Sequence, residues 1–110
     1  MIIMKTINID NYIYKIGNNA TENDQLIDNS DKLDTWFHLD GFPSCHGVIN
    51  CPIDQLSKQT IYLCAINIKK NSKFKKLCNV NVIYTQIENI KKTDKLGEVI
   101  LLKKCKTILI

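Results

Sequence analysis

One segment of this chain, residues 52–70, has the apolar spacing of a long amphipathic helix and limits the possible folds more than any other segment. Its apolar residues recur at helical intervals, and most of its lysines fall outside that stripe. The stripe consists of Ile61, Cys64, Ala65 and Ile68. Pro52 and Asp54 are typical of a helix start, so we expect the helix to run from there to about Lys70.

The rest of the chain consists of short segments with strand-like alternation, separated by turns. This alternation predicts strands within residues 5–17, 35–39, 47–51, 79–85 and 99–110, with Asp10-Asn11 as a tight turn and residues 107–110 closing a final hairpin with residues 99–102. Thr21 is expected to cap a short helix through Ile27, with Asp24 as its capping partner. The predicted fold class is α+β: a single domain over residues 1–110, with a mostly antiparallel sheet packed with one long central helix and a short N-terminal helix.

Length and cysteine content narrow the class of protein. A chain of 110 residues has room for one domain. No apolar run approaches the roughly 20 residues of a membrane helix, and the start lacks the features of a secretory signal. Five scattered cysteines without a CxxC pair do not form a disulfide framework. We therefore expect a soluble, cytoplasmic protein with free thiols.

Charge is distributed unevenly along the sequence. Residues 1–54 carry eight acidic side chains and three lysines, whereas residues 55–110 carry twelve lysines and three acidic side chains. All fifteen basic residues are lysine, so bidentate guanidinium contacts to phosphate are excluded. This polarity indicates an anionic partner for the C-terminal part, although a solvated lysine face would give the same pattern.

Eight short motifs occur in order between residues 7 and 110. They are Gly17-Asn18-Asn19, Asn23-Asp24-Gln25-Leu26, Asp34-Thr35-Trp36-Phe37-His38, Pro43-Ser44-Cys45-His46, Ser72-Lys73, residues 80–85, Gly97-Glu98-Val99 and Lys106-Thr107-Ile108. In this order the chain resembles the C-terminal RNA-binding (R) domain of the NFACT ribosome quality-control proteins, here as a stand-alone domain. Asn18 stands where that family has a basic residue, and Ser44-Cys45 stands where it has Gly-Ser.

The resemblance implies contact with tRNA or ribosomal RNA, and the residue types agree with that function. Asparagine amides can meet phosphates or base edges, and Trp36 and His38 project from one strand face, where a ring could stack on an unpaired base. Lysine side chains can neutralise the phosphates of the RNA backbone. The predicted nucleic-acid-binding residues are Asn19, Asn23, Trp36, His38, Ser44, His46, Lys69, Lys70, Lys73, Lys75, Lys76, Lys91 and Lys92.

Each of these residues also has a structural interpretation. Tryptophan is more often a core anchor than a stacking platform, and His38 and His46 fit hydrogen-bonded structural histidines. Asn19 and Asn23 fit turn residues that satisfy backbone groups. The lysines taken singly fit a solvated surface.

Two chemical alternatives are disfavoured. His38, Cys45, His46 and Cys51 have no usual zinc spacing, and adjacent residues of a strand point in opposite directions. Cys45 beside His46 suggests a thiol nucleophile, but sequence neighbours seldom form a catalytic pair. The glycine segment also lacks the P-loop pattern. We expect no enzymatic activity, no metal and no cofactor.

The predicted function is RNA binding linked to translation or ribosome-associated quality control, with the ribosome as a further candidate partner. A module that docks on ribosome-associated proteins, or a non-specific binder of DNA backbone, remains an alternative on the sequence alone.

Overall fold

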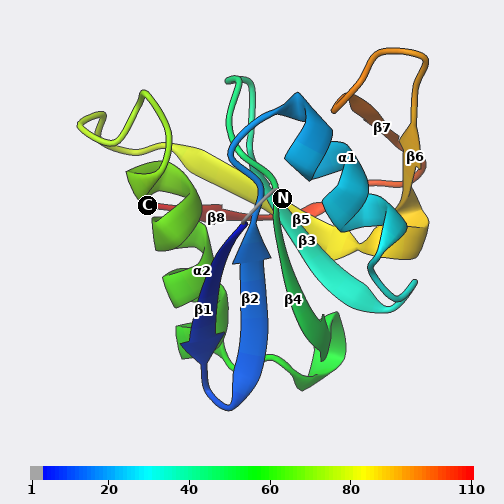
Figure 1. Cartoon of the computed structure of the whole chain (residues 1–110). Helices are drawn as coiled ribbons and strands as arrows, with labels where there is room; N and C mark the ends of the chain where they lie inside the picture. Colours follow the sequence, from blue (N-terminus) through cyan, green and yellow to red (C-terminus); the bar gives the residue numbers. More distant parts are fainter. Residues whose placement is uncertain (1–3) are drawn as a thin grey trace.

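The alternating segments of the sequence pair into an antiparallel sheet, seen in the computed structural model, which describes residues 4–110 (Figure 1). Six strands lie in the order β1-β2-β4-β3-β5-β8, and a separate two-stranded sheet pairs β6 with β7. The strands of the large sheet are β1 (Lys5–Ile9), β2 (Tyr12–Ile16), β3 (Asp34–Leu39), β4 (Gly47–Pro52), β5 (Asn81–Gln86) and β8 (Lys106–Leu109). Those of the small sheet are β6 (Ile90–Lys92) and β7 (Val99–Leu101). The two helices are α1 (Ala20–Asp28) and α2 (Lys58–Lys70). The prediction of a single α+β domain with a mostly antiparallel sheet is confirmed.

The first hairpin forms at the predicted turn. Asp10 and Asn11 connect β1 to β2, and both have positive φ angles, +52° and +68°. Two consecutive left-handed residues make a turn whose twist matches that of the flanking strands, and Asp and Asn tolerate this conformation better than most residues.

The large sheet is covered on both faces, because its central strands alternate between two apolar clusters. Phe37 of β3 and Ile49 of β4 face α2, in the cluster that contains Cys64, Ala65 and Ile68. Trp36 and Val48, one position away on the same strands, pack with Leu26 of α1 and with Ile87 and Ile90. The helices therefore lie on opposite faces of the sheet (Figure 1).

The predicted start of the second helix was wrong by six residues. Residues Ile53–Gln55 form a 3₁₀ turn, and α2 begins at Lys58 after Ser57, whose side chain accepts a hydrogen bond from the Thr60 N–H. Serine is a strong N-cap because its hydroxyl satisfies an N–H of the first turn. No helix within residues 4–110 combines the length and apolarity needed to span a bilayer.

The predicted cap of the first helix was also wrong. Asn19, not Thr21, caps α1: its Oδ1 accepts from the Glu22 N–H at 2.9 Å. Glu22 in turn accepts from the Asn18 N–H at 2.9 Å, so the capping partner is Glu22 and not Asp24. The arrangement resembles a capping box, but the Glu22 carboxylate bonds the N–H of the residue before the cap and not that of Asn19 itself.

The final hairpin does not form as predicted. Strand β7 pairs with β6, whereas β8 pairs with β5 at the edge of the large sheet. A second 3₁₀ turn, Ile87–Asn89, separates β5 from β6 and allows the chain to leave the large sheet. As a result the turn between β6 and β7 projects beside α1 (Figure 1).

Candidate nucleic-acid interface

A hollow of about 510 Å³ lies where four segments distant in the sequence meet. They are the start of α1, the β3–β4 loop, the turn after α2 and the turn between β6 and β7. Six of the predicted site residues line it: Asn19, Asn23, His38, Ser44, His46 and Lys73. The structure thus brings together the asparagine, histidine and serine candidates and one of the lysines.

The two asparagines hold the hollow together. Asn19 caps α1, and Asn23 is buried, with its Oδ1 accepting from the His46 N–H at 3.1 Å. The N–H of Gly17 donates to the His46 carbonyl at 3.0 Å. A Cβ on Gly17 would lie 2.3 Å from the Asn23 Oδ1, so only glycine permits this approach. These contacts fix His46 against the start of α1.

His46 is 3% exposed and is held as a neutral imidazole. The Trp36 Nε1–H donates to its Nδ1 at 3.1 Å, so the proton of the neutral ring is on Nε2. Burial is the main cause that lowers the pKa of His46 from 6.5 to about 3, and the neighbouring His38 adds to this effect. At neutral pH this ring is therefore a hydrogen-bond donor without a charge.

His38 has the opposite tautomer. Its Nδ1 lies 2.6 Å from the Leu39 carbonyl oxygen, which only accepts, so Nδ1 carries the proton and the Nε2 of the neutral ring is an acceptor. Burial lowers the pKa of His38, and the Leu39 hydrogen bond and the Asp40 charge oppose this. The rings of His38 and His46 meet edge to face, with centroids 5.0 Å apart.

The prediction that Trp36 stacks on a base is corrected by its burial. The indole is 1% exposed and belongs to the apolar cluster under α1. One of its faces lies parallel to His38, with centroids 5.6 Å apart and an interplanar angle of 10°. Trp36 and His38 do share a strand face, as predicted, but the buried indole of Trp36 packs against the rings of both histidines.

Ser44 lies on the wall of the hollow, and its hydroxyl is engaged by the loop. It accepts from the Leu39 N–H at 3.1 Å and donates to the Cys45 carbonyl at 2.9 Å. The β3–β4 loop is also held to the turn after α2, because Phe42 and Phe74 pack with ring centroids 4.6 Å apart. This contact places Lys73 beside the hollow.

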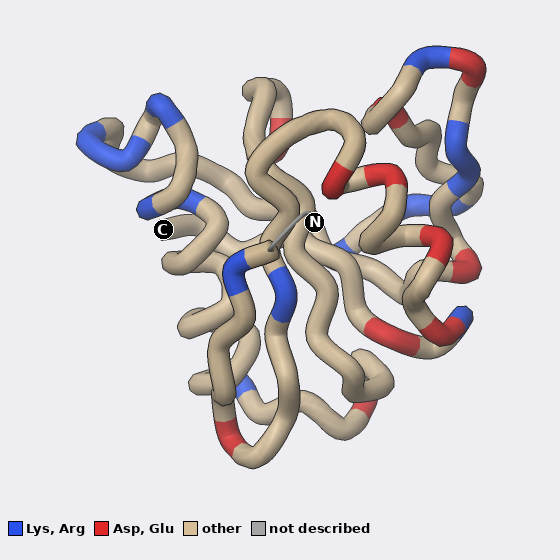
Figure 2. The backbone as a smooth tube through the Cα atoms, viewed as in Figure 1, with Lys and Arg blue, Asp and Glu red and all other residues tan. Residues whose placement is uncertain are grey.

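The predicted lysines separate into three groups. Lys73 lines the hollow. Lys70, Lys75 and Lys76 are exposed at the end of α2 and in the following turn and do not line it. Lys69 donates to the Ile110 carbonyl at 3.3 Å. Figure 2 shows the lysines after α2 gathered at one side of the molecule and the acidic residues of α1 on another.

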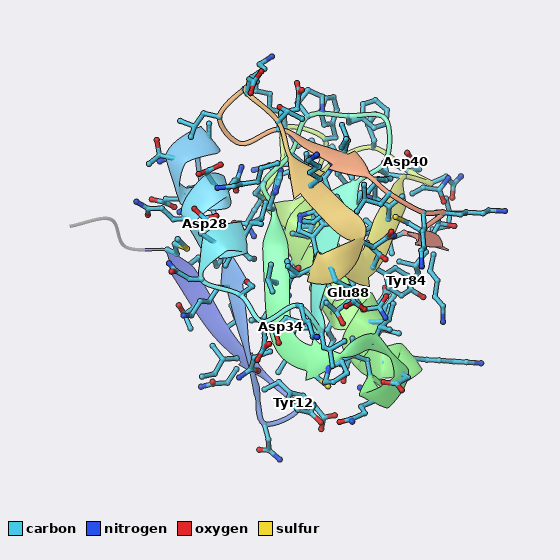
Figure 3. All side chains as sticks on the ribbon, turned by 90° about the vertical axis from the view of Figure 1, so that its right-hand side faces the viewer. Tyr12, Asp28, Asp34, Asp40, Tyr84 and Glu88 are labelled. Carbon is cyan, nitrogen blue, oxygen red and sulfur yellow. The ribbon has the colours of Figure 1, made fainter. Side chains whose placement is uncertain are left out.

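Lys92 does not belong to this basic side, contrary to prediction. Its Nζ lies 2.6 Å from Asp28 Oδ1 and 3.2 Å from Asp24 Oδ2 of α1, and these hydrogen bonds raise its pKa. Asp28 is labelled in Figure 3, on a side that also carries Asp34 and Glu88. Lys91, which precedes Lys92 on β6, is exposed and does not line the hollow.

The turn between β6 and β7 was not predicted as part of the site. Lys95, Leu96, Gly97 and Glu98 complete one wall of the hollow, together with Asn18 at the start of α1. Gly97 has φ +79°, and a Cβ there would lie 2.9 Å from the Ala20 Cα, so the turn packs directly on α1. The Gly97-Glu98-Val99 motif was the available sequence signal, although it gave no indication of where the turn would lie.

The disfavoured chemical alternatives do not gain support. No group of three or more potential metal ligands is found in the part of the chain that the structure describes. The Cys45 Sγ lies 3.8 Å from the Ile68 carbonyl of α2, and burial raises the pKa of its thiol to about 11. At neutral pH Cys45 is therefore protonated and is a poor nucleophile.

Comparisons with known proteins show the family of this chain. The family described as "NFACT protein RNA binding domain" matches residues 2–103. Coiled-coil domain-containing protein 25 of Mus musculus is 34% identical over 93 residues, which is 80% of this chain and 45% of that protein. The Danio rerio protein of the same name is 35% identical over 83 residues, 71% of this chain and 40% of that protein. The chain thus spans less than half the length of these curated relatives.

A solved structure shows the same fold. The C-terminal part of the fibronectin/fibrinogen-binding protein from Streptococcus suis superimposes with a TM-score of 0.87 at 24% sequence identity, over 97% of this chain and 44% of the other. At that identity the likeness concerns the fold alone. With the family match over residues 2–103, it follows that this chain belongs to the NFACT RNA-binding domain family.

Proposed function

We propose that residues 1–110 act as one NFACT-R-like domain that binds tRNA or ribosomal RNA at the hollow, in translation or ribosome-associated quality control. The observation that carries this proposal is a pair of neutral histidines, His46 buried and His38 half-buried, in a hollow whose rim carries lysines. Lys73 and Lys95 line the hollow, and neither forms an ion pair within residues 4–110. Unpaired ammonium groups are the side chains that release counterions when a polyanion binds.

The start of α1 adds to the positive potential of the hollow. Asn19 and Ala20 line it, and the N-terminus of a helix carries a partial positive charge with N–H groups directed outwards. Against these groups stands the carboxylate of Glu98, which accepts from the Thr93 hydroxyl at 3.0 Å. The Glu22 carboxylate, which accepts from the Asn18 N–H, offsets part of the charge of the helix start, so the two lysines carry the preference for an anion.

The revised site differs from the predicted one in several residues, and Lys69 and Lys91 are no longer part of it because neither lines the hollow. Lys95 joins it; Lys92 leaves it, because two aspartates of α1 pair with its ammonium; and Trp36 does not line the hollow but donates to His46. Lys70, Lys75 and Lys76 extend the basic surface beyond the rim. We propose that they contact the RNA backbone without sequence preference.

We propose binding and not catalysis as the role of the hollow. The thiol of Cys45 and the imidazole of His46 have pKa values of about 11 and about 3. A catalytic acid or base works best with a pKa near the operating pH. Both pKa values lie far from pH 7. The high pKa keeps the thiol protonated and the low pKa keeps the imidazole unprotonated, so both groups are uncharged.

Salt dependence tests the proposal. Fluorescence anisotropy would measure the affinity of the wild-type chain for labelled tRNA, a ribosomal RNA fragment and duplex DNA, between about 50 and 200 mM salt. We expect a steep loss of RNA affinity, and a Lys73→Ala/Lys95→Ala variant should reduce the log–log slope by about 1.4 to 1.8, at roughly 0.7 to 0.9 per phosphate contact.

The control variant, Lys32→Ala/Lys58→Ala, removes the same charge from exposed positions that do not line the hollow. Equal effects of the two variants would show that only net charge matters and would contradict the site. A flat salt response with no RNA retention would favour a protein partner, and preference for duplex DNA over both RNAs would favour a DNA-backbone binder.

A further inference from the structure

A second hollow, of about 380 Å³, lies beside the first, and its lining is mainly apolar. Its walls include Phe42, Ile83, Val99 and Leu101, of which Phe42 and Leu101 are 37% and 42% exposed. Both hollows are lined by His38, Pro43, His46, Gly97 and Glu98. The histidine pair thus stands where the two meet.

We infer that the two hollows together seat one unpaired nucleotide, with its base in the apolar hollow and its phosphate in the lysine-lined one. This inference rests on the proposed RNA-binding function and names the part of the RNA that is recognised. It predicts that an unpaired base adds affinity that a duplex of the same charge cannot supply.

The charges of the two linings set the orientation of the nucleotide. Lys73 and Lys95 line only the first hollow, whereas no lysine lines the second and Glu98 is its one carboxylate. A phosphate is attracted to the first and repelled from the second. The faces of a base are apolar and suit the side chains of Phe42 and Leu101, and a carboxylate beside them accepts hydrogen bonds from amino groups on the base edge.

The histidines supply a donor and an acceptor at the boundary. With the tautomers fixed by Trp36 and Leu39, His46 offers an Nε2–H and His38 offers an Nε2 lone pair. No protein group within residues 4–110 engages either Nε2 atom. The sole side-chain N or O atom there that is both sealed from solvent and unpartnered is the Asn89 Oδ1, so neither Nε2 atom is completely sealed from solvent.

His46 is only 3% exposed, and yet it lines both hollows. A protein leaves a buried polar group open in this way when water or a ligand completes its hydrogen bonding. Every base has an adjacent donor and acceptor on its Watson–Crick edge, and these are occupied in a duplex. An unpaired base is therefore the nucleic-acid group that fits this pair.

The test uses the full chain and an RNA hairpin with a short loop. Affinities would be measured for the intact hairpin, for hairpins with one loop nucleotide at a time made abasic, and for a fully paired duplex with the same number of phosphates. We expect one abasic position to weaken binding by about 5- to 150-fold, the range for one stacked base, and the duplex to bind as weakly. A 2-aminopurine at that position should change its fluorescence on binding.

Protein variants test which side chains contact the unpaired base. Leu101→Ser should lower the affinity for the intact loop and not for the abasic one, whereas the control Leu102→Ser should change neither, because Leu102, which is also exposed, lines neither hollow. His38→Phe keeps a ring against Trp36 and removes the Nε2 acceptor, so it should reduce the abasic effect. Trp36 fluorescence would verify that each variant is folded.

The outcomes separate this inference from the proposed function. Salt-dependent RNA binding with equal affinities for intact, abasic and paired RNAs would overturn the inference and leave the proposed function standing. An abasic effect that Leu101→Ser and Leu102→Ser alter equally would also overturn it. The absence of binding to any RNA would overturn both.

Discussion

We expect acidification from pH 7 to pH 5 to destabilise the folded domain, because His46 is buried as a neutral imidazole. Its pKa is lowered to about 3 in the folded state, against an ordinary value of 6.5. Between these values the unfolded chain binds a proton that the folded chain does not. The stability that the neutral ring contributes is therefore complete above pH 6.5 and is lost as the pH falls towards 3.

The size of the effect follows from the shift. Each pH unit inside the window costs about 1.4 kcal/mol per group, so His46 alone should lower the free energy of unfolding by about 2 kcal/mol between pH 7 and pH 5. That is a large part of the roughly 5 to 15 kcal/mol of a typical domain. The pKa of His38 is lowered too, so its contribution has the same sign.

Urea unfolding at pH 7, 6 and 5 would measure this loss, with the fluorescence of Trp36, the one tryptophan, as the probe. The control is His46→Gln, whose amide oxygen can accept from the Trp36 Nε1–H and whose side chain does not titrate. His38 and the carboxylates titrate in both proteins, so the difference between the two losses isolates His46. If both proteins lose the same free energy, His46 takes up its proton in the folded state and the reasoning is refuted.

Three further substitutions test the site and its supports. Gly17→Ala should destabilise the domain by about 2 to 4 kcal/mol in urea unfolding, since its Cβ meets Asn23 Oδ1 at 2.3 Å; a loss below 0.5 kcal/mol would contradict the close approach. Asn19→Ala should cost about 1 kcal/mol through the lost helix cap, and replacement by Asp should restore most of it. Lys92→Ala should leave RNA affinity nearly unchanged while Lys73→Ala weakens it, because two aspartates of α1 already pair with the Lys92 ammonium; equal losses in a filter-binding assay would return Lys92 to the site.

Local sequence patterns predicted the parts of this molecule that depend on neighbouring residues. The Asp10-Asn11 turn and the alternation of β3 follow from backbone preferences and from the two-residue period of a strand. The helix starts were less accessible, because several residues near each start can cap a helix and only the final geometry selects one. Asn19 caps α1 in place of Thr21, and α2 begins after Ser57 instead of at Pro52.

The sequence alone determined the fold class, the family resemblance and most of the polar residues that gather at the hollow. Only the tertiary structure decided that Lys92 is paired with α1, that Trp36 is sealed beneath the histidines, and that the turn containing Lys95 closes the site. The reason is physical: alternation and turn chemistry act between adjacent residues, whereas burial, ion pairing and the protonation state of His46 depend on atoms that folding brings together from distant segments.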